Sequence, residues 1–252
     1  MDTQNLPNNS AKRLLEILLK INYESSSYGR MINCSFLTIF CEALDVKQTL
    51  EIYYSELIKL VELIENLEND LQKLPQFRIN LYDDCLQKAK ESILLSNHNI
   101  PWRDINSNLK DPNSLMFKML YNCAMDLGEQ AVIINQDQLN ELKEKISRLL
   151  DNIIESDLSQ PLKSLLREKL IELRKVVEDY QFYGADGIRK IAEESLGALI
   201  INSSEVNAEP DKEPVKEFLK LLKDILDIAT KTKQFLPEGI GETLKNLLPP
   251  GS

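Results

Sequence analysis

The stretch DVKQTLEIYYSELIKLVELIENLENDLQKL, residues 45–74, contains the strongest structural pattern in the chain. Its apolar residues recur at alternating steps of four and three, which places them on one side of a helix over about four heptads. They are Val46, Leu50, Tyr53, Leu57, Leu60, Ile64, Leu67, Leu71 and Leu74. Asp45, with Gln48 three residues later, predicts the N-terminal cap, and Pro75 predicts the end of the helix. At about 1.5 Å per residue the helix would be about 45 Å long and would need an equally long neighbour.

Three later stretches repeat this spacing and supply such neighbours. They consist of Leu139, Leu142, Ile146, Leu149 and Ile153; of Leu162, Leu166, Leu170, Leu173, Val177 and Tyr180; and of Val215, Phe218, Leu222, Ile225 and Ala229. Between the first two lies ESDLSQPL, residues 155–162, where Ser159 can cap a helix and Pro161 suits its first turn. So short a connection predicts an antiparallel helical hairpin. We expect these stripes to pack within one chain, with pairing to another chain as the alternative.

The rest of the chain predicts shorter helices. They cover residues 10–22, 35–44, 76–95 and 111–127, and Gly128 is placed to end the last of them. The polar run at 96–114 predicts the longest loop. Because no stretch alternates apolar and polar residues as a strand does, the fold class is predicted to be all-α, a multi-helix bundle with long antiparallel coiled-coil-like helices.

Composition divides the chain into three parts. Residues 1–202 predict a helical bundle, with a sub-division near 130–136. Residues 203–213 predict a linker, because charge and proline rise there while apolar residues become rare. Residues 214–252 predict an amphipathic helix followed by a tail that contains proline and glycine.

The net charge narrows the classes of partner. The chain of 252 residues has a formal charge of -10 and a pI near 4.8. Affinity for nucleic acid comes largely from clustered Lys and Arg, so this balance argues against a nucleic-acid partner.

The cysteines and the apolar runs suggest a compartment. Cys34, Cys41, Cys85 and Cys123 lie far apart without a Cys-x-x-Cys pair, which favours buried free thiols in a reducing compartment. The amino terminus, MDTQNLPNNS, lacks a basic-then-apolar signal pattern. No uninterrupted apolar run approaches the roughly 20 residues that span a membrane. We therefore expect a cytoplasmic protein.

Most familiar catalytic patterns are missing from the sequence. His98 is the only histidine, so sites built from several histidines cannot form. Glycine-rich phosphate loops are also missing, and no cofactor is expected. Glu62, Glu65 and Glu68 recur at one helical turn and could bind Mg²⁺ in a hydrolase, although the second carboxylate pair that such a site needs does not follow.

A second stretch, EDYQFYGADGIRKIAEES at 178–195, gathers aromatic, glycine and charged residues. Gly184 is placed to adopt a left-handed conformation at the end of one helix, and Asp186 can cap the next. The simplest interpretation is a corner filled by aromatic side chains. The alternative is an anion-binding site at a helix N-terminus, formed by Gly184 and assisted by Arg189.

The carboxyl-terminal segment gives the main functional prediction. It combines an apolar face with several lysines, in the general form of a docking helix, and Phe218, Leu222, Ile225 and Phe235 are predicted to bind a partner. We therefore expect a non-catalytic interaction or regulatory protein, such as an adaptor, an immunity-type inhibitor or a component of a defence or stress complex. Its partner would be another protein or a second copy of the chain. One alternative is a protein that acts on a membrane through this segment, and another is the Mg²⁺-dependent hydrolase.

Overall fold

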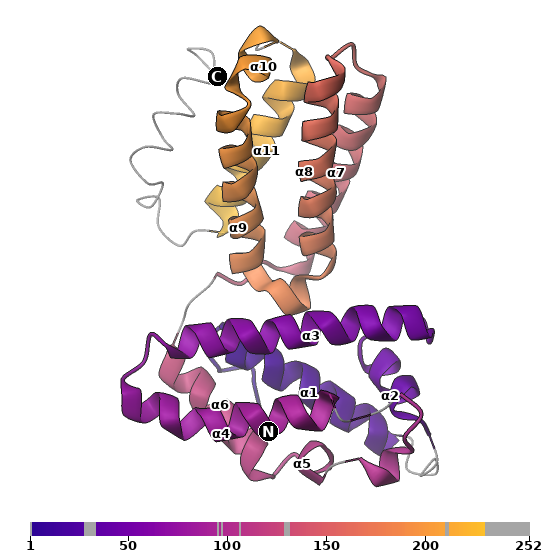
Figure 1. Ribbon diagram of the computed structural model, residues 1–252, viewed down its shortest axis with the longest axis vertical. Coiled ribbons are helices and arrows are strands. Elements are labelled where there is room, and N and C mark those ends of the chain that lie inside the picture. Colours follow the sequence, from indigo (N-terminus) through magenta and orange to yellow (C-terminus); the bar gives the residue numbers. More distant parts are fainter. Residues whose placement is uncertain are drawn as a thin grey trace. The chain divides into compact units, whose positions relative to one another are not determined.

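The computed structural model describes residues 2–27, 34–94, 96, 98–105, 107–128, 132–209 and 212–229. Within these ranges the chain forms eleven α-helices and one 3₁₀ helix, and no strand is present apart from an isolated bridge between Ser35 and Pro101. The predicted all-α class is therefore confirmed (Figure 1). The chain divides into two compact units, Met1–Gln130 and Ala131–Ser252, called unit 1 and unit 2 below. None of the described helices combines the length and the apolar character needed to cross a bilayer.

Unit 1 is organised around its first helix. Its elements are α1 (Ser10–Ser27), α2 (Phe36–Ala43), α3 (Leu50–Leu71), α4 (Gln76–Leu94), the 3₁₀ helix Trp102–Asp104, α5 (Ser107–Lys110) and α6 (Leu115–Leu127). Helix α1 packs against α2, α3, α5 and α6. Leu14, Leu15 and Leu18 on α1 are completely buried, so this helix supplies the centre of the core.

A buried asparagine joins the start of α1 to the end of α6. The Asn9 side-chain amide donates hydrogen bonds to the carbonyl oxygens of Ala124 (2.8 Å) and Gly128 (2.9 Å). Its side-chain oxygen accepts from the Lys12 backbone N–H at 3.0 Å. Both helix ends would otherwise leave backbone groups without partners inside the protein. Gly128 has a φ of 64° and ends α6 as predicted.

The connection between α2 and α3 differs from its prediction. Asp45 does not cap α3; its φ of 56° belongs to the end of α2. The Asp45 N–H donates to the Glu42 carbonyl oxygen at 3.0 Å, and the Val46 N–H donates to that of Cys41 at 2.9 Å. This is the Schellman arrangement, which usually has a glycine in the left-handed position, so an aspartate there gave no signal in the sequence.

Helix α3 is consequently shorter than predicted. The Thr49 side chain caps it by accepting from the Ile52 N–H at 3.3 Å, and the helix has 22 residues. At about 1.5 Å per residue this is about 33 Å rather than 45 Å. Val46 and Leu74 of the predicted stripe lie outside the helix and are only half-buried. The predicted start of α6 at 111 also moves, because Asp111 forms a turn by accepting from the Asn113 N–H, and the helix begins at Leu115.

Unit 2 is an up-and-down bundle of four helices. Its elements are α7 (Gln136–Glu155), α8 (Gln160–Glu178), α9 (Tyr180–Ile201), α10 (Ser203–Ala208) and α11 (Glu213–Ala229). Helix α7 packs on α8, α8 on α9, α9 on α11 and α11 on α7, which closes a ring (Figure 1). The predicted antiparallel hairpin is α7 and α8, and α7 begins with a capping box between Asn135 and Gln138.

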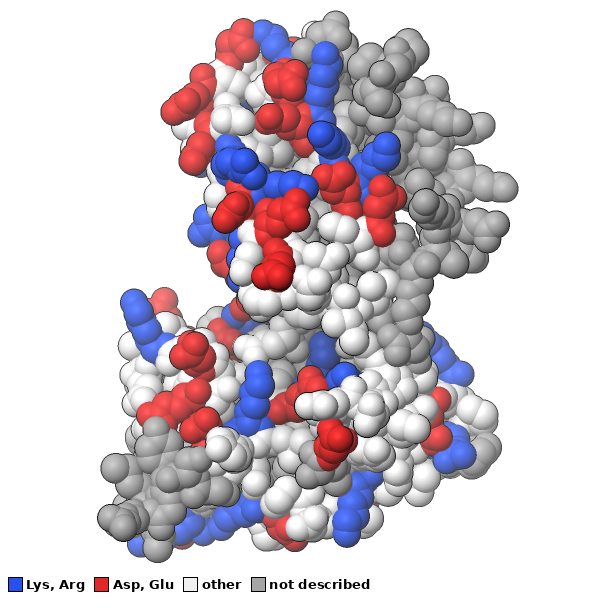
Figure 2. Space-filling model, turned by 180° about the vertical axis from the view of Figure 1, so that it is seen from behind, with Lys and Arg blue, Asp and Glu red and all other residues white. Residues whose placement is uncertain are grey.

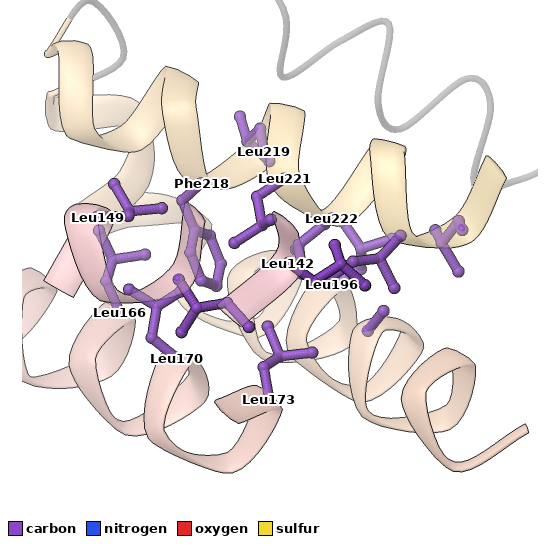
Figure 3. Packing of buried hydrophobic residues seen from close by; sticks show 14 of the residues in the cluster. Leu142, Leu149, Leu166, Leu170, Leu173, Leu196, Phe218, Leu219, Leu221 and Leu222 are labelled. Atoms are coloured by element: carbon purple, nitrogen blue, oxygen red, sulfur yellow. The ribbon is translucent and has the colours of Figure 1, made fainter. Parts of the chain in front are cut away.

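The centre of this bundle is a leucine-rich core. Leu166, Leu170 and Leu173 on α8 are completely buried and face side chains from the other three helices (Figure 3). Phe218 of α11 inserts its ring among them and is also completely buried. Eight residues of α11 are buried in all, namely Val215, Phe218, Leu219, Leu221, Leu222, Ile225, Leu226 and Ala229.

The first part of the segment predicted to be a linker, residues 203–208, is helical and packed. Residues 203–208 form α10, which contacts α8 and α9 and buries Val206. The Ser159 N–H donates to the Glu209 carboxylate at 3.0 Å, and Lys212 pairs with Asp157. One well-placed valine and these polar contacts with the α7–α8 turn hold a sequence whose composition alone suggested a free linker.

Replacing Asn9 by Ala should destabilise unit 1 by about 1–3 kcal/mol, because the ends of α1 and α6 would lose their shared hydrogen-bond partner in a buried position. Urea denaturation followed by circular dichroism measures this change. The matched control is Asn5→Ala, since Asn5 is exposed, and it should change stability by less than about 0.5 kcal/mol. Equal stabilities for the two variants would contradict the role given to Asn9.

Replacing Phe218 by Ala should lower the stability of unit 2 by about 3–5 kcal/mol, because it leaves a cavity in the middle of the bundle. Urea denaturation should show this loss as an unfolding transition at a lower urea concentration than in wild type. Lys220→Ala, an exposed position two residues away on α11, serves as control. A loss below about 1 kcal/mol for Phe218→Ala would mean that α11 is not part of the core.

Candidate functional site

A cluster of aromatic rings joins α2, α3 and the segment before α5. The aromatic cluster consists of Phe36, Phe40, Tyr53, Tyr54, His98 and Trp102. Tyr53 is its centre, with ring centroids 5.3 Å from Phe40, 6.3 Å from Phe36 and 5.1 Å from Tyr54, all edge-on. Such edge-to-face pairs stabilise beyond the area that they bury. The cluster therefore fixes α3 against α2.

Hydrogen bonds hold the 96–102 segment on this cluster. The Phe36 N–H donates to the Ile100 carbonyl oxygen at 2.9 Å, and the Trp102 N–H donates to that of Cys34 at 2.8 Å. The Tyr53 hydroxyl donates to the Ser96 carbonyl oxygen at 3.1 Å. The predicted loop is thus tied to two helices, and Trp102 stacks nearly parallel on Phe36.

His98 lies at the edge of the aromatic cluster. Its Nδ1 is 3.3 Å from the Tyr54 hydroxyl oxygen, and its backbone oxygen accepts from the Leu37 N–H at 3.1 Å. Its ring neighbours are Tyr53 and Tyr54. This arrangement positions the histidine as a structural contact between the segment and α3.

An ion pair lies on the buried side of α3. Glu56 and Lys59 are one turn apart, with the Lys59 Nζ 2.6 Å from the Glu56 Oε1, and both are buried. Burial raises the pKa of the nearby Cys41 thiol, and the Glu56 and Glu42 carboxylates raise it further. The thiol therefore remains protonated and unreactive at neutral pH.

The outer side of α3 presents apolar side chains. Leu50, Tyr54 and Ile58 are 49%, 48% and 59% exposed. Residues four apart on a helix lie on nearly the same side, so the three form one row, here called the α3 face. Leu57 and Val61 border the row and are half-buried. Leu50 and Leu57 were predicted to belong to the buried stripe. Tyr54 and Ile58 were not predicted as a site, although the spacing of four from Leu50 to Tyr54 and Ile58 is present beside that stripe.

The α3 face is unusual because α3 already buries a complete stripe on its other side. That buried stripe contains Tyr53, Leu60, Leu63, Ile64, Leu67 and Leu71. A helix on a protein surface normally carries polar residues opposite its buried stripe. An exposed apolar row in that position is a candidate surface for contact with another molecule.

The residues predicted to bind a partner from the carboxyl-terminal segment lie elsewhere. Phe218, Leu222 and Ile225 are completely buried in the core of unit 2 (Figure 3), so they stabilise the bundle and are not a surface. The reason is that α7, α8 and α9 leave one side of their shared core open, and the apolar side of α11 covers it. Phe235 lies outside the described residues.

The Gly184 corner has the predicted positive φ, although its ψ of -169° differs from that of a left-handed helical residue. Gly184 has a φ of 62° and interrupts α9, and a Cβ on the nearby Gly187 would lie 2.5 Å from the Tyr183 Cβ. Phe182 is buried there. Arg189 lies 4.0 Å from Asp186 and 3.8 Å from Glu193, so two carboxylates already neighbour the guanidinium proposed for an anion.

Charges on the rest of unit 2 are mixed in sign. Lys145 pairs with Glu141 (2.9 Å) and Asp224 (3.2 Å), and Lys169 pairs with Glu172 (2.8 Å). Figure 2 shows basic and acidic side chains lying among one another on the face of this unit that it draws. Such pairs of opposite charge give the surface no single sign.

The three glutamates considered for Mg²⁺ do not meet further ligands. Glu65 is exposed, and Glu68 is 3.7 Å from the Lys90 Nζ. In the part of the chain that the structure describes, no three His, Cys, Asp or Glu side chains come together as a group that could hold a metal ion.

Replacing Tyr53 by Phe should lower the stability of unit 1 by about 1 kcal/mol at pH 7, because the Ser96 carbonyl oxygen loses its donor. Burial raises the pKa of the Tyr53 phenol from 10.0 to about 12. The neutral phenol therefore stabilises the fold fully below pH 10, and this contribution is lost as the pH rises toward 12, at about 1.4 kcal/mol per pH unit.

The free energy of unfolding of wild type should thus exceed that of Tyr53→Phe by less above pH 10 than at pH 7. Urea denaturation at pH 7 and across this alkaline range measures it. Tyr54→Phe is the control, since the Tyr54 ring is half-exposed, and it should cost less stability than Tyr53→Phe at pH 7. A constant difference for Tyr53→Phe would contradict the buried, protonated phenol.

Comparison of this chain with protein-family models, with curated proteins and with solved structures finds no match. Its function has to follow from its own residues. Of the features described above, the α3 face is the one whose exposure the fold itself leaves unexplained.

Proposed function

We propose that this chain is a non-catalytic interaction protein that binds another protein through the α3 face. The observation that carries the proposal is the half-exposed apolar row Leu50, Tyr54 and Ile58 on a helix whose opposite side is already buried. Exposed apolar rows cost solubility unless a partner covers them, so they mark interaction surfaces.

The support for the face as a docking surface is its rigidity. Tyr54 contacts Tyr53 and His98 through its ring, and Tyr53 is completely enclosed by α2, α3 and the 96–102 segment. A surface held in place in this way loses little conformational entropy when a partner binds. An adaptor, an immunity-type inhibitor or a component of a larger complex would each use such a surface.

The compartment proposed is the cytoplasm. All four cysteines are free, and Cys41, Cys85 and Cys123 are buried. Burial raises the pKa of the Cys85 and Cys123 thiols to about 12, which keeps them protonated. Unpaired, buried thiols are typical of proteins in reducing compartments.

The two alternative functions have less support. The membrane hypothesis depended on the C-terminal amphipathic segment. Within that segment the apolar side of α11 is the core of unit 2, while Lys220, Lys223 and Asp227 lie outside it, and residues 230–252 are not among the described residues. The hydrolase hypothesis depended on Glu62, Glu65 and Glu68, which meet no further ligands among the residues described. Neither alternative has an observation in its favour comparable to the α3 face.

Replacing Ile58 by Glu should abolish binding of the physiological partner, because it places a charge on the most exposed side chain of the apolar row. The measurement is affinity capture from the native host with wild type, Ile58→Glu and Ile171→Glu as baits, followed by mass spectrometry. Ile171 on α8 is 55% exposed and makes a matched control. Proteins that are retained by wild type and Ile171→Glu and lost with Ile58→Glu are the expected result.

Both variants should unfold in urea within about 0.5 kcal/mol of wild type, since the replaced side chains are exposed. If the three baits retain the same proteins, the α3 face is not the docking surface.

A further inference from the structure

The charges of α3 have one sign on every surface that a partner could reach. The helix contains six carboxylates, Glu51, Glu56, Glu62, Glu65, Glu68 and Asp70, and one basic residue, Lys59. Lys59 is buried and paired with the buried Glu56. The charges that α3 itself leaves toward solvent are therefore acidic, and one of them, Glu68, lies 3.7 Å from the Lys90 Nζ of α4.

These carboxylates continue the α3 face along the helix. Glu65 follows Ile58 by seven residues, and Glu68 follows Val61 by the same interval. Residues seven apart lie on the same side of a helix. The face is thus apolar over the first half of α3 and acidic over the second, where the carbonyl end of the helix adds further negative potential.

The exposed apolar area is too small to hold a partner alone. Three side chains that are about half exposed offer on the order of 300 Å², taking about 200 Å² for one large side chain. A stable interface buries about 800 Å² on each partner. A second copy that paired its own apolar row with this one would stay below that area, and its carboxylates would repel those of the first copy if it lay along the whole helix.

We infer that the partner is an amphipathic helix with basic residues following its apolar stripe. This inference rests on the function proposed above. Laid along α3, such a helix covers Leu50, Tyr54 and Ile58 with its apolar half and places lysines or arginines beside Glu62 and Glu65. Such a helix matches both halves of the face. Because α3 has 22 residues, contact along its whole length buries more area than contact with the apolar row alone.

The test uses the full chain and two synthetic helical peptides of the length of α3. In both peptides one half of the helix carries leucine and isoleucine along one side. In the other half, the same side carries lysines in the first peptide and glutamates in the second. Fluorescence anisotropy should show the lysine peptide binding at least about fivefold more tightly, as expected when several exposed pairs add. The difference should shrink as salt is raised.

Two variants separate the halves of the face. Ile58→Glu should weaken binding of the peptides through the apolar half, and Glu65→Lys should weaken the lysine peptide while strengthening the glutamate peptide. Glu213→Lys makes the same change of net charge at an exposed position on α11 and should leave the affinities for both peptides unchanged.

Three results would overturn the inference. One is equal binding of the two peptides, or binding of neither, while affinity capture still loses a protein with Ile58→Glu; the proposed function would then stand with a partner of different chemistry. Another is a dimer in light scattering that Ile58→Glu dissociates, since a second copy would then cover the face. The last is pelleting of wild type with phosphatidylserine vesicles that Ile58→Glu abolishes.

Discussion

Burial of one apolar stripe by another in the same unit is the constraint on which this structure depends. In unit 2 the stripes of α7, α8 and α9 share a core that three helices cannot enclose, and α11 closes it with Phe218 at the centre. The amphipathic character that made α11 resemble a docking helix is the property that a fourth bundle helix needs. Amphipathicity alone does not distinguish these two roles.

Helix α3 also buries an apolar stripe in its own unit, but it carries further apolar side chains on its outer side. The inner side contributes Tyr53 and the Glu56–Lys59 pair to unit 1. The outer side leaves Leu50, Tyr54 and Ile58 toward solvent. Since the inner contacts fully determine where the helix lies, the composition of its outer side is free to be selected for something other than folding. The apolar half and the acidic half of that side are therefore best explained together.

Much of the fold could be predicted from local sequence, because helix period, caps and glycines act over a few residues. The α7–α8 hairpin, the end of α6 at Gly128 and the positive φ of Gly184 all follow from such signals. Asp45 was assigned to the wrong helix because its left-handed conformation is normally that of glycine. The burial of α11 and the exposure of Ile58 could not be predicted, since each depends on which space the other helices leave open. For the same reason the partner-binding surface was predicted on the segment that forms α11, whereas the exposed apolar row lies on α3. The spacing of four between Leu50, Tyr54 and Ile58 was nevertheless present in the sequence.

The short, folded connection between α9 and α11 has a consequence for how unit 2 behaves. Helix α10, the bond from Ser159 to Glu209 and the Lys212–Asp157 pair hold the start of α11 beside the bundle. A tether this short gives α11 an effective concentration on the order of millimolar at its own groove. A free helix with a similar stripe would have to be present at comparable levels to displace it, and exchange of α11 between two molecules is disfavoured in the same way. Unit 2 is thereby protected against competitors for its core.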